Sequence, residues 1–399
     1  MTTARKRDLA LFAAGLSTFM SLYCAQVLLP ELSRDFDVTP SQASLLVSLA
    51  TGALALAIIP VSSLSERYGR TRVMLTSSAV SVGVGLLLPL CSSFEALAVV
   101  RTLQGLALAG VPAVAMAYLA DEVPPASLGG AMGRYVAGTA IGGVMGRLVP
   151  GMVTDVAGWR WALAVTMMAC LGFTVLFWAL LPPSRNFRPG RADHRALLGH
   201  LGVPRLRRLY LVALVLVAGF VTTFNFLPFR LLDDPFGLPQ AVVSLIAVAN
   251  LAGSFTSAWA GTLADRVGRR PVLVGAILVS AAGLLLTLPP SLPFIGLGLL
   301  LFTGGFLAAH AVASGWVGSI ATTARAQASA LYLFSYYLGS SIGGSAGGLA
   351  YERAHWAGVG AYVLVLLTIG LVAATFVRAG ATRVVPLDLN GRLVGKLPR

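Results

Sequence analysis

The sequence predicts an all-α polytopic membrane protein whose twelve transmembrane helices form two pseudo-symmetric six-helix bundles. The chain has 399 residues, of which 57% are hydrophobic and only 11% are charged, whereas soluble domains carry about 25% charged residues. The apolar residues fall in runs of roughly 18–25, long enough for helices that cross about 30 Å of hydrocarbon. A short charged sequence also occurs twice, about half a chain length apart, which indicates a duplicated membrane domain.

The apolar runs predict helices because they do not alternate with polar residues, as the shorter strands of a membrane barrel do. The first run lacks a convincing small-residue cleavage site, so we expect it to be retained as a span. The twelve predicted spans lie near residues 8–31, 42–64, 73–91, 94–118, 128–152, 160–182, 208–232, 240–263, 271–288, 292–318, 325–350 and 356–378.

One long polar connector separates the first six spans from the last six. We therefore expect an N-terminal bundle over 1–182, a basic cytoplasmic linker over 183–207 and a C-terminal bundle over 208–378. A cytoplasmic tail follows over 379–399. Within the linker, residues 192–201 fit either a short amphipathic helix on the membrane surface or a flexible basic segment.

The net charge of +14 is confined mainly to the segments on one side of the predicted spans. This asymmetry follows the positive-inside rule and predicts that both termini lie in the cytoplasm. We expect a protein of the bacterial inner membrane. The basic residues then contact anionic lipid head groups, and nucleic acid is not expected as a partner.

The repeated charged sequence, here called the cassette, reads SSLSERYGRTR at 62–72 and GTLADRVGRR at 261–270. Glycine permits a tight turn between two spans. The carboxylate can pair with an arginine or a helix N-terminus, which would make each cassette a cytoplasmic gate; a merely solvated turn is the alternative. The aligned residues are Glu66, Arg67, Gly69 and Arg70 in the first copy and Asp265, Arg266, Gly268 and Arg269 in the second.

Glycines recur every fourth residue in the fifth and eleventh spans. Small residues at this spacing make a flat helix face, on which a second backbone can pack closely in lipid. The predicted packing residues are Gly138, Gly142 and Gly146 in the fifth span and Gly339, Gly343 and Gly347 in the eleventh.

The second cassette and the residues after it, GTLADRVGRRPVL at 261–273, closely resemble the signature loop of the major facilitator superfamily. The first cassette resembles it more weakly, because Ser62, Glu66 and Thr71 replace the usual residues. The resemblance covers the twelve spans and implies a transporter fold.

Two further segments carry the resemblance. The fourth span, with Arg101, Gln104 and Gly105, resembles the second motif of the superfamily. The fifth resembles the antiporter motif of twelve-span drug:proton antiporters, except that Gly143 takes the place of the usual proline. The resemblance implies proton-coupled efflux and a part for Arg101 in proton coupling.

Polar residues inside the spans are candidates for a substrate and proton pathway, because charges in lipid are costly and normally face protein or water. Four lie in the predicted outer half: Arg101, Arg147, Tyr23 and Gln26. They could line one cavity wall, with snorkelling of the arginines to the surface as the alternative. Three more candidates are Asn225, Asn250 and His310, for which interhelical hydrogen bonding or packing is the plainer interpretation.

No aspartate or glutamate lies deep inside a predicted span. Two buried arginines without a deep acid favour a neutral or anionic organic substrate over a bulky cation. His310 can titrate near neutral pH and serve a proton relay. The sequence shows no metal cluster, catalytic nucleophile–base pair or nucleotide-binding motif, so we expect neither an enzyme nor a cofactor.

The sequence therefore predicts a secondary active transporter, acting as a monomer, that moves a small organic molecule by alternating access. Proton-coupled efflux is the leading interpretation. The first alternative is a uniporter or importer of a sugar or organic anion with the same fold. A membrane sensor or membrane-bound enzyme is a distant alternative.

Overall fold

The computed structural model describes residues 2–187 and 194–377, and in these ranges the regular structure is entirely helical. The elements are α1 (Thr3–Tyr23), α2 (Leu29–Asp35), α3 (Pro40–Tyr68), α4 (Arg70–Gly85), η1 (Leu88–Leu90), α5 (Phe94–Leu108), α6 (Gly110–Glu122), α7 (Pro125–Leu180), α8 (His194–Leu201), α9 (Pro204–Leu232), α10 (Gln240–Ser244), η2 (Leu245–Val248), α11 (Ala249–Val267), α12 (Arg269–Leu286), α13 (Leu292–Ile320) and α14 (Arg325–Thr375).

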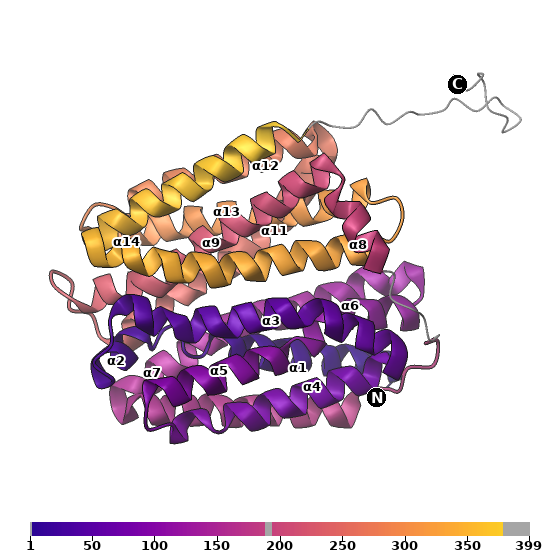
Figure 1. Ribbon diagram of the computed structural model, residues 1–399, viewed down its shortest axis with the longest axis horizontal. Helices are drawn as coiled ribbons and strands as arrows, with labels where there is room; N and C mark the ends of the chain where they lie inside the picture. The colour runs from indigo at the N-terminus through magenta and orange to yellow at the C-terminus, as the bar shows by residue number, and fades with distance from the viewer. Residues whose placement is uncertain (1, 188–193, 378–399) are drawn as a thin grey trace, which may run out of the picture.

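The helices form two halves that lie side by side with their long axes roughly parallel (Figure 1). The first half contains α1–α7 and the second contains α9–α14. Helices α3 and α14 lie against each other between the halves. The all-α membrane fold is thus confirmed. Nine helical stretches of the described residues are long and apolar enough to cross a membrane, and the count of twelve spans stays a prediction.

Two of these nine stretches, α7 and α14, have 56 and 51 residues, and each has a break in its helical backbone. In α7 the break is at Gly158, which has φ of +77°, a value that glycine adopts easily. In α14 it is at Ala354 and His355. The orange and yellow stretches of α14 meet at the left of Figure 1 and diverge toward the right. These breaks fall between the predicted fifth and sixth spans and between the predicted eleventh and twelfth spans.

Several predicted spans of the first half are interrupted in the structure. The span predicted over 8–31 ends as helix α1 at Tyr23, and residues 24–28 form a turn before α2. The span predicted over 94–118 is divided at Ala109 and continues as α6 to Glu122. Hydropathy predicts that a segment is buried in lipid, but it does not detect such local breaks.

The predicted linker 183–207 is partly helical, since it contains α8 and the start of α9. The predicted amphipathic helix at 192–201 overlaps α8. Residues 188–193 and the predicted tail 379–399 lie outside the described residues.

The two cassettes have the same backbone shape. Gly69 joins α3 to α4 with φ of +98°, and Gly268 joins α11 to α12 with φ of +95°. Side chains other than glycine rarely adopt this conformation. A single glycine can therefore end one helix and begin the next in both halves.

The repeated glycines pack α7 on α1 and α14 on α9. A Cβ atom on Gly142 would lie 2.4 Å from the Leu16 carbonyl oxygen, and one on Gly343 would lie 2.3 Å from the Ala218 Cβ. The remaining glycines are equally close to the facing helix: Gly138 to Phe12, Gly146 to Met20, Gly339 to Leu214 and Gly347 to Thr222. Both halves thus use the same helix contact, as pseudo-symmetry requires.

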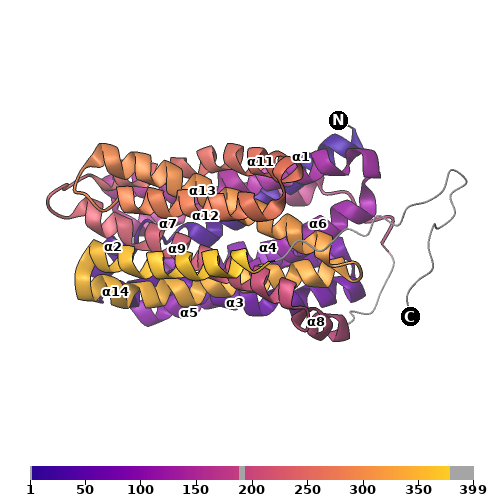
Figure 2. The same cartoon turned by 90° about the horizontal axis from the view of Figure 1, so that it is seen from above.

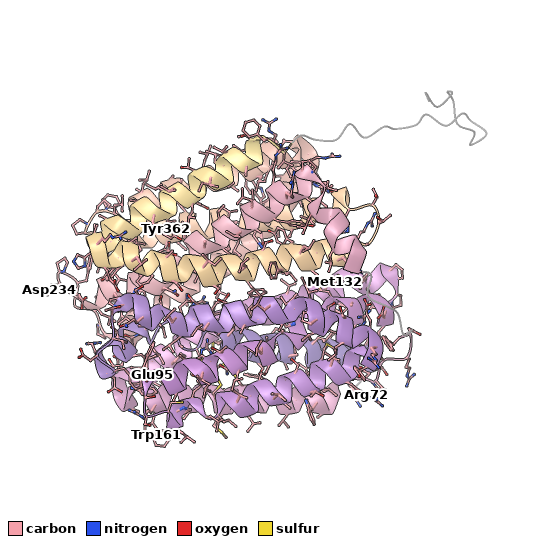
Figure 3. All side chains as sticks on the ribbon, viewed as in Figure 1. Arg72, Glu95, Met132, Trp161, Asp234 and Tyr362 are labelled. Atoms are coloured by element: carbon pink, nitrogen blue, oxygen red, sulfur yellow. The ribbon has the colours of Figure 1, made fainter. Side chains whose placement is uncertain are left out.

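The molecule has two distinct ends, which both views show (Figures 1 and 2). We call the end that holds α8 and the first cassette the cassette end, and the end that holds α2 the opposite end. Figure 3 marks them with side chains: Arg72 lies at the cassette end, and Glu95 and Asp234 lie at the opposite end.

Candidate functional site

Arg147 lies on α7 at the junction of the two halves and is only 4% exposed. Its Nε donates a hydrogen bond of 2.6 Å to the Gln26 side-chain oxygen, and its Nη1 donates one of 2.6 Å to the Gly143 carbonyl. The guanidinium carbon lies 4.1 Å from the centre of the Tyr23 ring and 5.4 Å from that of Phe224. Aromatic faces stabilise a cation that has lost water, but they leave its net charge in place.

Among the described residues, no carboxylate forms an ion pair with Arg147. A buried charge normally has a partner of opposite sign, because desolvation is expensive. The unneutralised guanidinium is therefore the strongest indication of an anion site in the described structure.

Gln26 connects Arg147 to the second half. Its side-chain nitrogen donates a hydrogen bond of 2.6 Å to the Asn225 side-chain oxygen on α9. The Asn225 side-chain nitrogen is fully buried and has no partner among the described residues, and the Ser48 hydroxyl is in the same situation. Both face the same point, because a Cβ on Gly344 would lie 3.1 Å from the Asn225 nitrogen and 2.9 Å from the Ser48 oxygen.

An aromatic cluster extends from Arg147 into the second half. Phe224 packs on Phe220 with ring centres 4.7 Å apart, and Phe220 stacks on Phe306 at 4.2 Å. Phe306 in turn contacts His310 at 6.2 Å. The cluster continues through the rings of Tyr332, Tyr336 and Tyr337, and Tyr337 packs in the same group of buried residues as Tyr23.

His310 lies among the rings of Phe306, Tyr332 and Tyr336. Its Nδ1 shares a hydrogen bond of 3.0 Å with the Tyr332 hydroxyl, and its ring centre lies 4.8 Å from that of Tyr336. A histidine with a single phenolic partner can bind or release a proton without breaking an ion pair. The contacts fit both interpretations of His310, packing and proton relay.

Arg101 occupies a different environment, although it is completely buried. Its Nε donates to the Leu46 carbonyl at 3.0 Å, and its Nη1 donates to the Ser21 carbonyl at 3.0 Å. Nη1 also donates to the Gln104 side-chain oxygen at 2.6 Å, and Nη2 donates to the Leu22 carbonyl at 2.6 Å. Most of its donors are thus bound to backbone oxygens.

These contacts explain how Arg101 positions the site. Ser21 and Leu22 belong to the last turn of α1, whose carbonyls have no amide partner within the helix. Arg101 satisfies them and fixes the turn 24–28 that carries Gln26. The structure therefore brings Tyr23, Gln26, Arg147 and Asn225 together, whereas Arg101 supports that group from outside it.

Asn250 does not join this group. It lies in the first turn of α11, and its side-chain nitrogen has no hydrogen-bond partner among the described residues. Ser48 was not expected from the sequence, because serine is common in membrane helices and carries no motif. Its position opposite Asn225 is the observation that assigns it to the candidate site.

The cassettes differ in their contacts. In the first, Arg70 forms an ion pair of 3.3 Å with Asp121 on α6 and a hydrogen bond of 2.7 Å to the Ser65 hydroxyl. In the second, Arg269 donates to the Ser319 hydroxyl on α13. Glu66 and Asp265 form no ion pair within the described part of the chain. The observed cassette contacts therefore link helices within one half rather than across the two halves.

The rest of the chemistry-bearing residues indicate no further centre. Within residues 2–187 and 194–377, no group of three or more histidine, cysteine, aspartate or glutamate side chains is placed to hold a metal ion. Cys24, Cys91 and Cys170 are buried free thiols.

The sequence matches the family model of the Major Facilitator Superfamily over residues 11–263 and 209–394. It is 43% identical over 374 residues to the inner membrane transport protein YnfM of Escherichia coli (strain K12), covering 92% of this chain and 89% of that protein. It is 42% identical over 371 residues to an MFS-type transporter, YybF, of Bacillus subtilis (strain 168), covering 92% of each.

Solved structures show the same fold. A bacterial homolog of the human lysosomal transporter Spinster, in an inward-facing and occupied conformation, superposes with a TM-score of 0.75 at 17% identity. The match covers 93% of this chain and 95% of that one. The fold, the family model and the relatives agree, so this chain is an integral inner-membrane secondary transporter rather than an enzyme, and it belongs to the major facilitator superfamily.

Proposed function

We propose that this transporter exports a small organic anion in exchange for protons, by alternating access to a site centred on Arg147. The observation that carries the substrate class is the buried Arg147 guanidinium, which has hydrogen bonds and aromatic contacts but no ion pair among the described residues. A carboxylate on the substrate would supply the missing negative charge through a paired hydrogen bond.

The neighbours of Arg147 support the same assignment. Asn225 and Ser48 each have a buried polar atom that lacks a partner among the described residues, and such atoms gain from a polar ligand group. The aromatic cluster between Phe224 and His310 provides an apolar surface for the body of a planar substrate. The preferred substrate is then a compact aromatic carboxylate.

The direction of transport and the proton coupling are supported by the resemblance of residues 138–147 to the antiporter motif. His310, in contact with Tyr332 and Tyr336, is the proposed proton-binding group. The cassette end is proposed to face the cytoplasm, because both cassettes and the basic start of α9 lie on that side of the spans. The protein works as a monomer whose basic segments contact anionic lipid, with the bundle boundary within 183–207.

An importer or uniporter of organic anions is the second candidate. It is favoured by the absence of an ion-paired carboxylate at Arg147 within the described residues, since a titrating acid near the site is the simplest device for proton exchange. Arg147 serves anion binding in both candidates.

Transport in proteoliposomes with an imposed pH gradient tests the proposal. The probes are benzoate, benzamide and benzylamine, which share one ring and differ in charge. Proton antiport predicts that protons flowing down their gradient drive benzoate in the opposite direction. The anion site predicts that benzoate is transported in preference to benzamide and benzylamine. Benzoate flux that ignores the gradient would reject proton coupling and favour uniport, and flux in the direction of the protons would favour import. Preference for benzylamine would reject the anion site.

A further inference from the structure

At the opposite end, each half of the molecule places a carboxylate on a helix N-terminus of the other half. Asp155 of α7 accepts hydrogen bonds from the backbone amides of Gln240 at 3.1 Å and Ala241 at 2.8 Å. Glu352 of α14 accepts one from the backbone amide of Ser41 at 3.1 Å. Gln240 begins the 28-residue helical stretch Gln240–Val267, and Ser41 lies in the first turn of α3.

These two contacts are related by the duplication of the chain. In both helices a proline directly precedes the first donating amide, in Pro40-Ser41 and Pro239-Gln240. Both carboxylates lie just before the backbone break of their long helix. A buried tryptophan follows each carboxylate by four residues, in the segments DVAGW at 155–159 and ERAHW at 352–356. A pairwise repeat of this kind is hard to attribute to two unrelated surface contacts.

The contacts are chemically favourable in a way that depends on the two halves being together. The first amides of a helix have no partner within the helix and carry partial positive charge. A carboxylate satisfies them with charge-assisted hydrogen bonds. Each carboxylate here comes from the other half, so both contacts must break when the halves separate at this end.

The other hydrogen bonds between the halves also lie outside the cassettes. Gln240 also donates from its side chain to the Val27 carbonyl, the Ser44 hydroxyl donates to the Gly344 carbonyl, and Gln26 donates to Asn225. Among the described residues, these three and the carboxylate contacts are the hydrogen bonds that join the halves, and none involves a cassette residue. The structure is therefore the state that is closed at the opposite end.

We propose that Asp155 and Glu352 are a reciprocal pair of latches that set the balance between the two access states of the transport cycle. Each carboxylate stabilises the state closed at the opposite end, and neither contacts the proposed substrate site. The inference rests on alternating access, but it does not depend on the identity of the substrate or on proton coupling.

Distances between spin labels, measured on the purified protein without substrate, test the latches. One label pair, at Asp37→Cys and Asp234→Cys, reports on the opposite end, and a second pair, at Arg72→Cys and Thr322→Cys, reports on the cassette end. All four positions are exposed. The background carries alanine in place of the native buried cysteines, which are Cys24, Cys91 and Cys170.

Asp155→Ala and Glu352→Ala should each lengthen the distance at the opposite end and shorten it at the cassette end. We expect each change to shift the ratio of the two states about three- to tenfold, and the double variant to shift it further. Glu95→Gln is the matched control, because Glu95 is an exposed carboxylate in the first turn of α5 at the same end.

Two results would overturn the proposal. One is an unchanged set of distances in both single variants, even if their thermal stability falls, because a purely structural cap alters stability without altering the ratio of states. The other is an equal shift in the Glu95→Gln control. Because the side chains are on the surface, the single variants suffice if the double variant does not fold.

Discussion

Arg147 and Arg101 are both buried arginines of the first half, and their partners give them different tasks. Arg101 donates to the backbone carbonyls of Ser21, Leu22 and Leu46, so it holds α1 and α3 in place. Arg147 donates to Gln26 and Gly143 and contacts two aromatic rings, so its charge remains available. Motif resemblance singles out Arg101, whereas the contacts single out Arg147.

Replacement of Arg101 tests its supporting role. Arg101→Gln should destabilise the protein by at least about 3 kcal/mol, because a buried carbonyl left without a partner costs about 1–3 kcal/mol. The measurement is thermal unfolding in detergent. An Arg101→Gln variant that unfolds at the wild-type temperature but no longer transports would instead place Arg101 on the transport pathway.

Replacement of Arg147 tests anion binding. Arg147→Gln should weaken benzoate binding about 10- to 100-fold, because a hydrogen bond to a charged group contributes about 1.5–3 kcal/mol. Arg147→Lys should recover only part of the loss, since lysine lacks the paired donor geometry. Ligand-induced thermal shift measures both variants. Equal benzoate stabilisation of wild type and Arg147→Gln would remove Arg147 from the site.

At the scale of the helix, the sequence predicts which segments are buried better than it predicts where a helix is interrupted. The cassettes and the glycines of α7 and α14 were found by pattern, because a positive φ and a close backbone contact both require glycine. The end of α1 at Tyr23 has no local sequence signal, since the carbonyls it leaves are satisfied by Arg101, a residue distant in sequence. The same limit applies to Asp155 and Gln240, whose contact exists only after the halves assemble.

The contact between α1 and α7 can be tested with two glycines of one helix. Gly142→Ala should destabilise the protein by about 1–3 kcal/mol, the usual range for overpacking, because its Cβ would lie 2.4 Å from the Leu16 carbonyl oxygen. Gly172→Ala in α7 is the control, since its Cβ meets nothing within 4 Å. Thermal unfolding that ranks the two variants equally would contradict the close contact.

At the scale of the whole molecule, the two halves repeat the same construction: a glycine turn in each cassette, a glycine-mediated helix pair and a carboxylate that reaches the other half. The duplication was evident in the sequence, and it predicts the architecture well. It does not predict the site, because Arg147, Tyr23 and Gln26 belong to the first half and meet Asn225 and Phe224 of the second. Because the two halves contribute different residues to the site, the site can bind a substrate in a single orientation.

The cassettes give a further prediction at this scale. Asp265→Asn and Glu66→Gln should both shift the accessibility of the molecule toward the state that is open at the cassette end, if each carboxylate helps to close that end in the other state. The two spin-label pairs described above measure this shift. A shift in only one variant would show that the two gates are unequal, and no shift in either would remove the cassettes from gating.

Counterflow measures whether a small organic anion crosses the membrane through a site on Arg147, as we claim. Proteoliposomes preloaded with unlabelled benzoate are diluted into labelled benzoate, with benzylamine-loaded vesicles and the Arg147→Gln variant in parallel. We predict transient accumulation of benzoate in wild-type vesicles, little accumulation with Arg147→Gln, and none of benzylamine. Equal benzoate accumulation by wild type and Arg147→Gln, or accumulation of benzylamine alone, would contradict the claim.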